Sequence, residues 1–473
     1  MSRATQPTRI LVVGGGGREH ALAWKLAAEP GVNEVVVAPG SDAIAREPRV
    51  RRAVVDPLDA EAVVRVARER SVELAVVGPE APLAAGVADA LRAAGVPTVG
   101  PGAGAARIET SKAFCHDIAA AAGVAMARSA AFGPATATEA RDWAAAEADR
   151  PGSLGAVVKV DGLAGGKGVA VCDGADEAIE AIGELVARGE TFVVEERLTG
   201  PEASVIVLSD GRDGMIAFPP ARDHKRLLDG DRGPNTGGMG AYTPLPDLSE
   251  DELDAIVDSI HRPILRELGR RGTPFQGFLY AGLMLTPDGP RLLECNARLG
   301  DPEAQVLLPQ LAVPLGPILV AAARGSLGSG WGARFPTFPG AAVGVVLASA
   351  GYPALPSASE RIEGIDRAEA RGATVFHAAT RAVEGGWETA GGRVLTVVAR
   401  GADLAEASEA ADRAAAEITW PGMQRRHDIG TDAAVAAIAF GTPAWSAATR
   451  SRRWARSGRT ARASRRCSAS SSR

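Results

Sequence analysis

Short apolar runs alternate with helix-forming stretches along residues 9–100, and this alternation restricts the fold more than any other feature. The runs RILVV, EVVVA, LAVVG and PTVG begin at residues 9, 34, 74 and 97. Helical stretches begin between them, at about Glu19, at about Asp59 and after Pro82. Strands that alternate with helices form a parallel sheet covered on both faces. We therefore predict an α/β fold with a parallel-sheet domain at residues 1–106.

The length of 473 residues exceeds what one hydrophobic core organises, so further domains are expected. Residues 107–325 alternate strand patterns with Gly-rich loops and are assigned to one large domain. Residues 326–432 are predicted to form a small α+β domain. Residues 433–473 are dense in Ser and Arg, so we expect a disordered tail. Such a basic tail can bind phosphate backbones, and an appended extension without a dedicated role is the simpler alternative.

The composition argues against several classes of protein. No apolar stretch approaches the roughly 20 residues of a membrane span, so no membrane partner is expected. The four cysteines lack metal-ligand or redox spacing, and no apolar leader precedes the first strand, which favours a cytoplasmic location. The net charge is −5 although residues 441–473 contain nine arginines and no acid. The body is therefore acidic, and no nucleic-acid partner is expected for it.

Lysine is rare in this chain and concentrated in a few motifs. Only five of the 52 basic residues are lysine, and four of them lie in compact polar or Gly-rich segments, namely Lys112, Lys159, Lys167 and Lys225. Arginine is a broad planar fork, whereas lysine is a slim point charge that fits closely against phosphate. The pattern predicts a protein that binds a nucleoside triphosphate, and chance placement of a few lysines is the alternative.

Two strand ends in the N-terminal domain carry possible ligand-binding residues. Gly16 and Gly17 follow a strand and open a helix, where backbone N–H groups can bind an anion. Glu19 occupies the third glycine position of the dinucleotide fingerprint, so a sugar-phosphate site or a structural turn is predicted instead. Glu80 follows another strand, at the edge where ligands collect in parallel sheets. It can equally be a charge at the start of a helix.

The segment from Lys159 to Gly168 resembles a phosphate-binding loop. A strand delivers Lys159, and the loop that follows contains Gly165, Gly166, Lys167 and Gly168. Glycines let the backbone lie against phosphates. The loop is not a Walker motif, because it is one residue too short and Gly168 replaces the hydroxyl residue. A structural hairpin is the alternative.

An acidic strand end follows this loop in the sequence. Glu195 and Glu196 end the strand pattern TFVVEE, and an irregular segment with Leu198 leads to Glu202. Such a segment can offer backbone groups to an adenine edge and carboxylates to a ribose, so we assign these four residues to ATP binding together with the lysines of the loop and Lys112. A solvated acidic edge is the alternative.

The strand RLLECNAR predicts a metal site. Glu294 and Asn296 share one face because side chains alternate along a strand, and Arg298 follows on the same face. Two oxygen ligands suit Mg²⁺ that is bound jointly with phosphates. Arg298 can neutralise an oxyanion or hold a carboxylate. A salt-bridged strand end is the alternative.

A long polar loop predicts a substrate site. Asp223 and Lys225 lie in DHKR, and a Gly-rich stretch with Asn235, Thr236, Gly237 and Gly238 follows. Loops of this length commonly bind substrate. Asp223 can hold an ammonium group, and Lys225 can meet the developing charge of a phosphate.

Taken together, GGGGREHA, GPEAPL, VDGLAGGKGV, DHKR with GPNTGGMGAY, FLYAGLM and ECNARLGDPE closely resemble the phosphoribosylamine–glycine ligase family of the ATP-grasp superfamily. The resemblance covers residues 9 to about 430. It implies a preATP-grasp domain, an ATP-grasp domain with a mobile lid at about 124–196, and a small C-terminal domain. Gly15 and Gly165 depart from the usual Asn and Ala of the family, and FLYAGLM supplies no second metal-binding acid.

The resemblance also implies the chemistry. ATP, with Mg²⁺ or Mn²⁺, would drive ligation of glycine to 5-phosphoribosylamine through glycyl phosphate, a step of purine biosynthesis. Asp223, Lys225 and Arg298 would be catalytic, and the protein would act as a monomer. The alternatives are a related carboxylate–amine ligase, an ATP sensor without turnover, and a nicotinamide dehydrogenase, which Glu19 disfavours.

Overall fold

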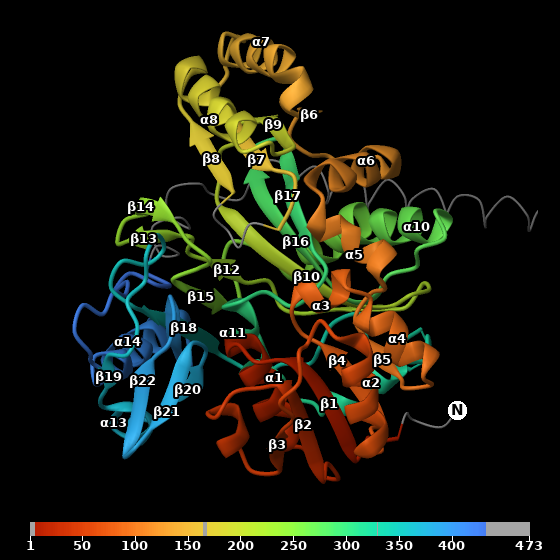
Figure 1. The fold of residues 1–473 in the computed structure, drawn as a ribbon, viewed down its shortest axis with the longest axis vertical. Coiled ribbons are helices and arrows are strands. Elements are labelled where there is room, and N and C mark those ends of the chain that lie inside the picture. Colours follow the sequence, from red (N-terminus) through yellow and green to blue (C-terminus); the bar gives the residue numbers. More distant parts are fainter. Residues whose placement is uncertain (1–4, 164–167, 329, 432–473) are drawn as a thin grey trace, which may run out of the picture.

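The computed structural model describes residues 5–163, 168–328 and 330–431 (Figure 1). The predicted tail at 433–473 and three residues of the predicted phosphate loop, Gly165, Gly166 and Lys167, lie outside these ranges. Within them, no helix combines the length and the apolar character needed to cross a bilayer.

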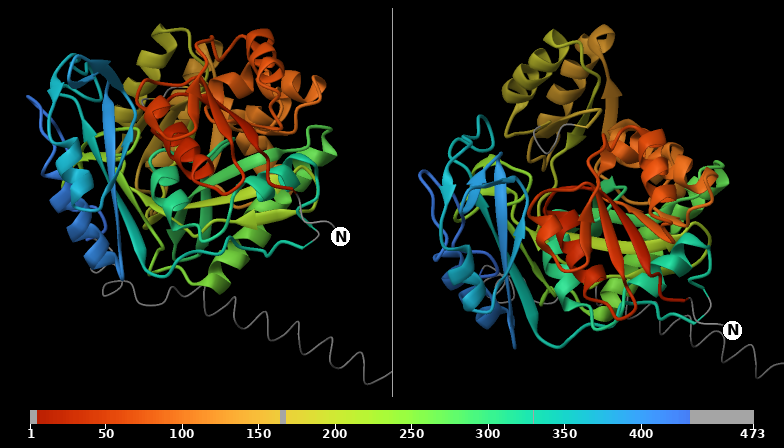
Figure 2. Two further views of the ribbon diagram at one scale, coloured as in Figure 1. Left: turned by 90° about the horizontal axis from the view of Figure 1, so that it is seen from below. Right: turned by 60° about the horizontal axis from the view of Figure 1, so that its bottom comes forward.

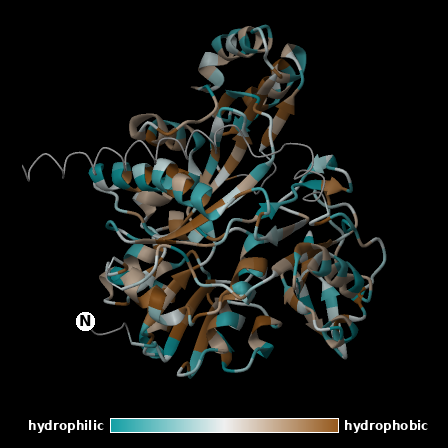
Figure 3. Ribbon diagram, turned by 180° about the vertical axis from the view of Figure 1, so that it is seen from behind, coloured by the Kyte–Doolittle hydropathy of each residue, from teal (hydrophilic) through white to brown (hydrophobic). Residues whose placement is uncertain are grey.

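The N-terminal domain is built on a five-stranded sheet in the order β3-β2-β1-β4-β5. All of its strand pairs are parallel, as predicted. Its strands and helices are β1 (Arg9–Gly14), α1 (Gly17–Ala27), β2 (Glu34–Pro39), η1 (Ile44–Arg46), β3 (Val50–Arg52), α2 (Ala60–Glu69), β4 (Leu74–Val77), α3 (Glu80–Ala84), α4 (Val87–Ala93) and β5 (Thr98–Val99). Figure 3 shows the strands of this sheet mostly in the hydrophobic colour. Because β1 and β4 are neighbours, the loops that follow them meet at one edge of the sheet.

Two helices, α5 (Ala103–Thr110) and α6 (Lys112–Ala122), lead into a subdomain that stands at the top of Figure 1. We call it the lid. It contains an antiparallel sheet in the order β6-β9-β7-β8 and two covering helices. Its elements are β6 (Ser129–Phe132), η2 (Pro134–Thr136), α7 (Ala137–Ala148), β7 (Ala156–Val160), β8 (Val169–Cys172), α8 (Ala175–Ala187) and β9 (Phe192–Glu196). Its buried apolar side chains form a cluster of their own.

The central sheet lies beneath the lid and is antiparallel, in the order β11-β10-β16-β17. Its strands are β10 (Glu202–Asp210), β11 (Met215–Ala217), β16 (Gln276–Thr286) and β17 (Gly289–Asn296), with helices α9 (Glu250–Ile256), η3 (Val257–His261), α10 (Arg262–Arg270), α11 (Glu303–Gln310) and α12 (Gly316–Ala323). Helix α11 packs against α1 of the N-terminal domain, so the two domains share apolar core.

A five-stranded sheet in the order β12-β15-β18-β23-β20 dominates the C-terminal region (Figure 2). Its elements are β12 (Arg222–Asp223), β15 (Gly240–Thr243), β18 (Ala341–Ala348), β20 (Thr374–His377), β23 (Arg393–Gly401) and α14 (Leu404–Ala415). Nearby lie the hairpin β13 (Arg226–Leu228) and β14 (Arg232–Asn235), and α13 (Ile365–Ala370) with a small sheet of β19 (Arg361–Ile362), β21 (Thr380–Val383) and β22 (Gly386–Thr389). β12 and β15 come from the predicted large domain, so the boundary placed at 326 separates segments of one sheet.

Candidate active site

Lys159 connects the lid to the strand of the predicted metal ligands. The pairing of β7 with β9 places its side chain on the same face as Glu195. The Nζ atom donates to the carbonyl oxygen of Leu293 at 3.0 Å and lies 2.8 Å from Glu195 Oε2. The ammonium group is thus held against the backbone directly next to Glu294, so the two residues predicted to share a phosphate site lie close together.

Glu195 is a buried partner of two lid-side groups. In addition to the Lys159 contact, its Oε1 lies 2.8 Å from Nε2 of His116, whose Nδ1 lies 2.8 Å from the Ser129 hydroxyl. Burial alone would raise the pKa of Glu195, but Lys159 and His116 outweigh it and hold this pKa below its usual value. Both carboxylate oxygens therefore have protein partners, and a direct contact of Glu195 with a nucleotide stays a prediction.

Glu196 points to the opposite face of β9, into an arginine cluster. Its carboxylate lies 3.1 Å from Arg128 Nε, 2.9 Å from Arg150 Nη2 and 3.7 Å from Arg291 Nη1. These contacts tie the lid strands together and reach β17, which is a structural role. Leu198 follows β9 in an irregular segment, and Glu202 begins β10. The contacts of Leu198 and Glu202 with ATP stay predictions.

Glu294 and Asn296 lie on one face of β17, as the strand alternation predicts. Tyr280 and Gly282 of β16 are their partners in the sheet, so no acid stands opposite either residue. Burial favours the neutral form of Glu294, but Lys225, Lys112 and Lys159 outweigh it and lower its pKa. A carboxylate surrounded by lysines stays ionised and suits a site shared by a divalent cation and phosphates.

Lys112, Glu195 and Glu294 line one narrow pocket between α6, β9 and β17. Lys112 is the first residue of α6. The described residues contain no group of three His, Cys, Asp or Glu side chains arranged to hold a metal ion. The predicted ligands beside this pocket, the Glu294 carboxylate and the Asn296 amide oxygen, would leave the rest of a cation's shell to phosphate oxygens and water. This donor set fits Mg²⁺.

Asp223 and Lys225 are close to these ligands. The Lys225 Nζ atom lies 2.6 Å from Glu202 Oε2. Burial opposes its charge, but Glu202, Tyr280 and Glu294 outweigh burial and raise the pKa of Lys225. Burial and the nearby Glu303 raise the pKa of Asp223, and its Oδ1 atom has no hydrogen-bond partner among the described residues. A buried carboxylate oxygen of this kind can receive a cationic group of a substrate.

The predicted substrate loop folds back over these two residues. The Thr236 amide and hydroxyl both donate to the Lys225 carbonyl oxygen, at 2.7 and 2.8 Å. Gly238 has φ +112°, and a Cβ atom there would lie 2.6 Å from Asp223 Oδ1, so the position excludes a side chain. Gly237 donates to the Tyr352 hydroxyl at 2.9 Å. Asn235, at the end of β14, pairs with Arg226 across the hairpin.

At the edge of the N-terminal sheet, Glu19 occupies the space that glycines leave. Its Oε2 accepts from the Gly16 amide at 2.8 Å, and its Oε1 lies 2.6 Å from Arg18 Nε. A Cβ atom at Gly78 would lie 2.3 Å from Glu19 Oε1. A Cβ atom at Gly17 would likewise lie 2.8 Å from the Gln305 amide nitrogen. Packing alone therefore explains why glycine occupies these positions. Phosphate contact by Gly16 and Gly17 stays a prediction.

The sequence analysis did not assign several charged residues of this region. Glu303 Oε1 accepts from the Ser204 hydroxyl at 2.9 Å, and Asp301 lies 3.5 Å from Arg393. Arg393 also donates to the Gly237 carbonyl oxygen, which fixes the substrate loop from β23. Asp301 and Glu303 belong to the quoted motif ECNARLGDPE, so a signal existed for them. Arg393 has no local signal, because tertiary packing alone brings β23 to the loop.

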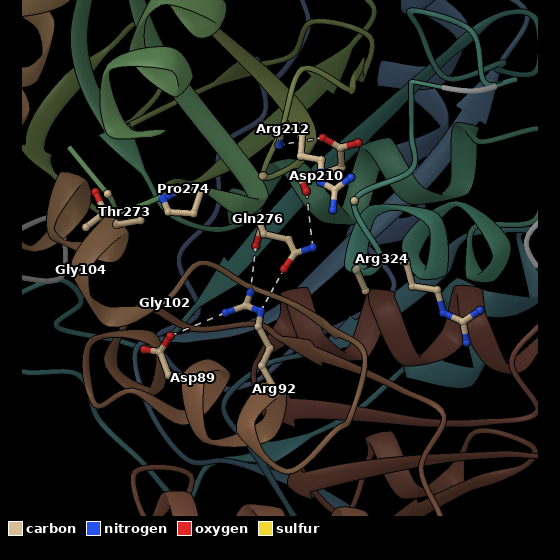
Figure 4. A pocket seen from close by; sticks show the side chains of 15 residues that line it. Asp89, Arg92, Gly102, Gly104, Asp210, Arg212, Thr273, Pro274, Gln276 and Arg324 are labelled. Atoms are coloured by element: carbon tan, nitrogen blue, oxygen red, sulfur yellow. Dashed lines mark hydrogen bonds and ion pairs between the residues drawn. The ribbon is translucent and has the colours of Figure 1, made fainter. Parts of the chain in front are cut away.

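A pocket of about 530 Å³ lies elsewhere, between the N-terminal domain and the central sheet (Figure 4). None of the predicted site residues lines it. Arg92 donates from Nε to Gln276 Oε1 at 3.0 Å and from Nη2 to the Gly100 carbonyl oxygen. The Arg92 guanidinium thus has hydrogen-bond acceptors within the protein. We interpret the pocket as part of the junction between the two domains.

Comparison with protein families covers most of the chain. Three domain families of phosphoribosylglycinamide synthetase match this chain. They are the N domain over residues 8–109, the ATP-grasp (A) domain over residues 110–304 and the C domain over residues 342–432. Phosphoribosylamine–glycine ligase from Streptomyces coelicolor is 48% identical over 430 residues, which cover 90% of this chain and 99% of the relative. The ligase from Rhodopirellula baltica is 44% identical over 436 residues, 90% of this chain and 98% of the relative.

Solved structures agree with this comparison. The crystal structure of phosphoribosylamine–glycine ligase from Thermotoga maritima has a TM-score of 0.72 at 31% identity and covers 89% of this chain and 100% of that chain. A biotin carboxylase domain from Hydrogenobacter thermophilus has a TM-score of 0.65 at 16% identity and covers 89% of this chain and 92% of its own. The second likeness shows a common fold only.

Proposed function

The chain belongs to the phosphoribosylglycinamide synthetase family, and on this premise we propose that it ligates glycine to 5-phosphoribosylamine with the conversion of ATP to ADP and phosphate. The observation that carries the proposal is the set of ammonium groups around Glu294, to which Lys112, Lys159 and Lys225 all contribute. Such a site stabilises phosphoryl transfer, a reaction that requires no protein nucleophile.

In the first step a carboxylate oxygen of glycine forms a bond to the γ-phosphorus, and the bond to the β-phosphate oxygen breaks. Lys159 and Lys225 offset the charge that spreads over the transferred group. Glu294 and Asn296 would hold Mg²⁺ or Mn²⁺, which when bound neutralises phosphate charge. The products of this step are glycyl phosphate and ADP.

In the second step the amine of phosphoribosylamine attacks the glycyl carbonyl carbon. A C–N bond forms, the C–O bond to phosphate breaks, and the amine loses a proton. Arg298 lies 3.2 Å from Glu80 of the N-terminal domain, at the edge where we place the sugar phosphate with Gly16 and Gly17. We assign Arg298 to the leaving phosphate, because its guanidinium fork matches phosphate geometry.

Asp223 is assigned to the glycine ammonium group. Its Oδ1 atom is buried without a hydrogen-bond partner among the described residues, and an ammonium ion would supply one. Asn235, Thr236, Gly237 and Gly238 are assigned to substrate binding, as the loop that folds back over Asp223 and Lys225. The pairing would also lower the raised pKa of Asp223, so glycine binding and ionisation of Asp223 support each other.

The lid is assigned to the exclusion of water, because an exposed acyl phosphate is hydrolysed. Its separate apolar cluster supports movement as a unit. The loop with Gly165, Gly166, Lys167 and Gly168 is assigned to the ATP phosphates, and Leu198 and Glu202 to the adenosine. We also propose that the enzyme is a monomer, that it is cytoplasmic and that its folded body binds no nucleic acid.

ADP release tests this function. We expect turnover with ATP, glycine and phosphoribosylamine together, and loss of turnover when either co-substrate is omitted. Replacement of glycine by alanine or serine separates this ligase from a related carboxylate–amine ligase. Turnover that is indifferent to glycine would reject the proposal.

A further inference from the structure

We propose that Glu109 is a positioning residue that turns the Asn296 amide so that its oxygen, and not its nitrogen, faces the metal site. The inference rests on the proposed function, because it concerns the assigned ligand Asn296. Glu109 itself touches neither substrate nor metal in this assignment. It was not among the residues predicted from the sequence.

Glu109 lies in the last turn of α5 and is only 4% exposed. Its Oε2 atom accepts from the Ala297 amide at 2.7 Å, and its Oε1 atom lies 2.9 Å from Arg298 Nη2. One carboxylate therefore fixes the backbone directly after Asn296 and the side chain of Arg298. Helix α5 joins the N-terminal domain to the ATP-grasp segment. The contacts of Glu109 therefore also fix the position of the end of β17 relative to the N-terminal domain.

The same carboxylate decides the orientation of the Asn296 amide. One end of that amide lies 3.3 Å from Glu109 Oε1 and 3.3 Å from the carbonyl oxygen of Cys295. Both neighbours are acceptors, so only the NH₂ group satisfies them. The amide oxygen is then turned away from Glu109, where it can serve as a cation ligand together with Glu294. A cation tolerates an oxygen at this position and not an amide nitrogen.

This arrangement predicts an unusual response to Glu109→Gln. A glutamine that accepts from the Ala297 amide must place its own NH₂ group where Oε1 lay, and every variant with this glutamine also loses the ion pair with Arg298. This NH₂ group attracts the oxygen of Asn296, so the asparagine reverses and presents its NH₂ group to the cation. Loss of a residue that orients a metal ligand typically lowers metal affinity by about 10- to 100-fold.

The test is direct Mn²⁺ binding in the presence of ADP, followed by electron paramagnetic resonance of the free ion. We expect Glu109→Gln to weaken Mn²⁺ affinity by about 10-fold or more. The swap variant Glu109→Gln/Asn296→Asp should recover to within about threefold of the wild type. In it, one oxygen of the new aspartate accepts from the glutamine and the equivalent oxygen faces the metal.

Glu29→Gln is the matched control. Glu29 is also buried at 4% exposure and also accepts from backbone amides, those of Leu315 and Gly316. It has no contact with β17 among its hydrogen bonds, so its substitution should leave Mn²⁺ affinity unchanged even if it lowers the melting temperature. A merely structural role of Glu109 predicts the same result for both single variants.

Two outcomes would overturn the inference: wild-type Mn²⁺ affinity in folded Glu109→Gln, or no recovery in the swap variant. If Glu109→Gln does not fold, the Mn²⁺ affinity of the swap variant decides between the two roles of Glu109. The affinity of Asn296→Ala is then the reference for a protein that has lost this ligand. Failure of the proposed function would appear separately, as wild-type protein that binds Mn²⁺ with ADP but shows no glycine-dependent turnover.

Discussion

Arg298 Nε lies 3.2 Å from Glu80 Oε2, so the guanidinium two residues beyond β17 is joined directly to the first residue of α3 in the N-terminal domain. Its Nη2 atom reaches Glu109 at the same time. Burial opposes the charge of Arg298, but Glu109 and Glu80 outweigh it and raise its pKa. One side chain thus joins α3 and α5 to the segment that follows the predicted metal ligands.

Arg298→Lys should lower kcat/KM for phosphoribosylamine by about 10- to 100-fold, because one ammonium group cannot bridge two carboxylates as the fork does. Steady-state kinetics with each substrate varied would measure this. The KM for ATP should change less than twofold. An equal loss for both substrates would contradict a link to the sugar-phosphate side.

Glu294→Ala should lower kcat by at least about 1,000-fold, because it removes the carboxylate of the assigned metal site. ATP should still bind in part, as the lysines remain. Single-turnover ADP formation measures the chemistry, and calorimetry measures ATP binding. Glu180→Ala, on the exposed side of α8, is the control. Retained turnover at high Mg²⁺ would refute the assignment.

Lys159→Arg should lower kcat by about 100-fold although the charge is kept. The slim ammonium group sits between Glu195 and the Leu293 carbonyl oxygen at 7% exposure, where a planar guanidinium does not fit. Lys25→Arg is a matched control, because Lys25 Nζ also donates to a backbone carbonyl, that of Leu311, at 2.9 Å. Equal activity of both variants would show that lysine is not required at position 159.

Acid should destabilise the fold through His261, which is fully buried and lies 3.1 Å from the Val205 carbonyl oxygen. Burial lowers its pKa from 6.5 to about 4. Between these values the unfolded chain binds a proton that the native protein does not, so stability falls as pH falls. At pH 5 the loss relative to pH 7.5 is about 2 kcal/mol from this group. Urea unfolding should show a smaller pH difference for His261→Gln, and an unchanged difference would contradict this.

Truncation after residue 432 should leave kcat intact. All assigned site residues precede this point, and the match to the family's C domain ends there. Comparison of the full and shortened chains in the ADP assay tests this, with thermal melting as a check of folding. A large loss of kcat would assign a role to the last 41 residues.

Much of the fold followed from the sequence because its signals are local. The parallel sheet of the first domain and the strands β7, β8, β9, β10, β16 and β17 were predicted from short apolar runs and are observed. The stretch from Asp223 to Gly240 was predicted as a loop, and there the structure has the short strands β12, β13, β14 and β15, whose polar and Gly-rich sequences carry no apolar run. The pairing of β15 with β18 was not predicted, because strand partners distant in sequence leave no local pattern.

The site shows the same division. Glu294 and Asn296 were predicted as a pair because alternation along one strand places them on one face, and this shared face is observed. Glu109 and Arg393 were missed because each acts across a domain contact, and their own neighbourhoods in the sequence resemble an ordinary helix and an ordinary strand. Glu195 and Glu196 look equivalent in the sequence, yet the two faces of β9 give one a lysine partner and the other an arginine cluster.

The sharing of one sheet by β15 and β18 limits how this chain can be divided. Removing everything from residue 326 onward would not release an independent module, since the four residues of β15 would lose the strand that pairs with Gly240 to Thr243. An uncovered strand edge invites association with other chains. Engineering of shorter or fused versions should therefore keep both pieces, or supply a substitute strand.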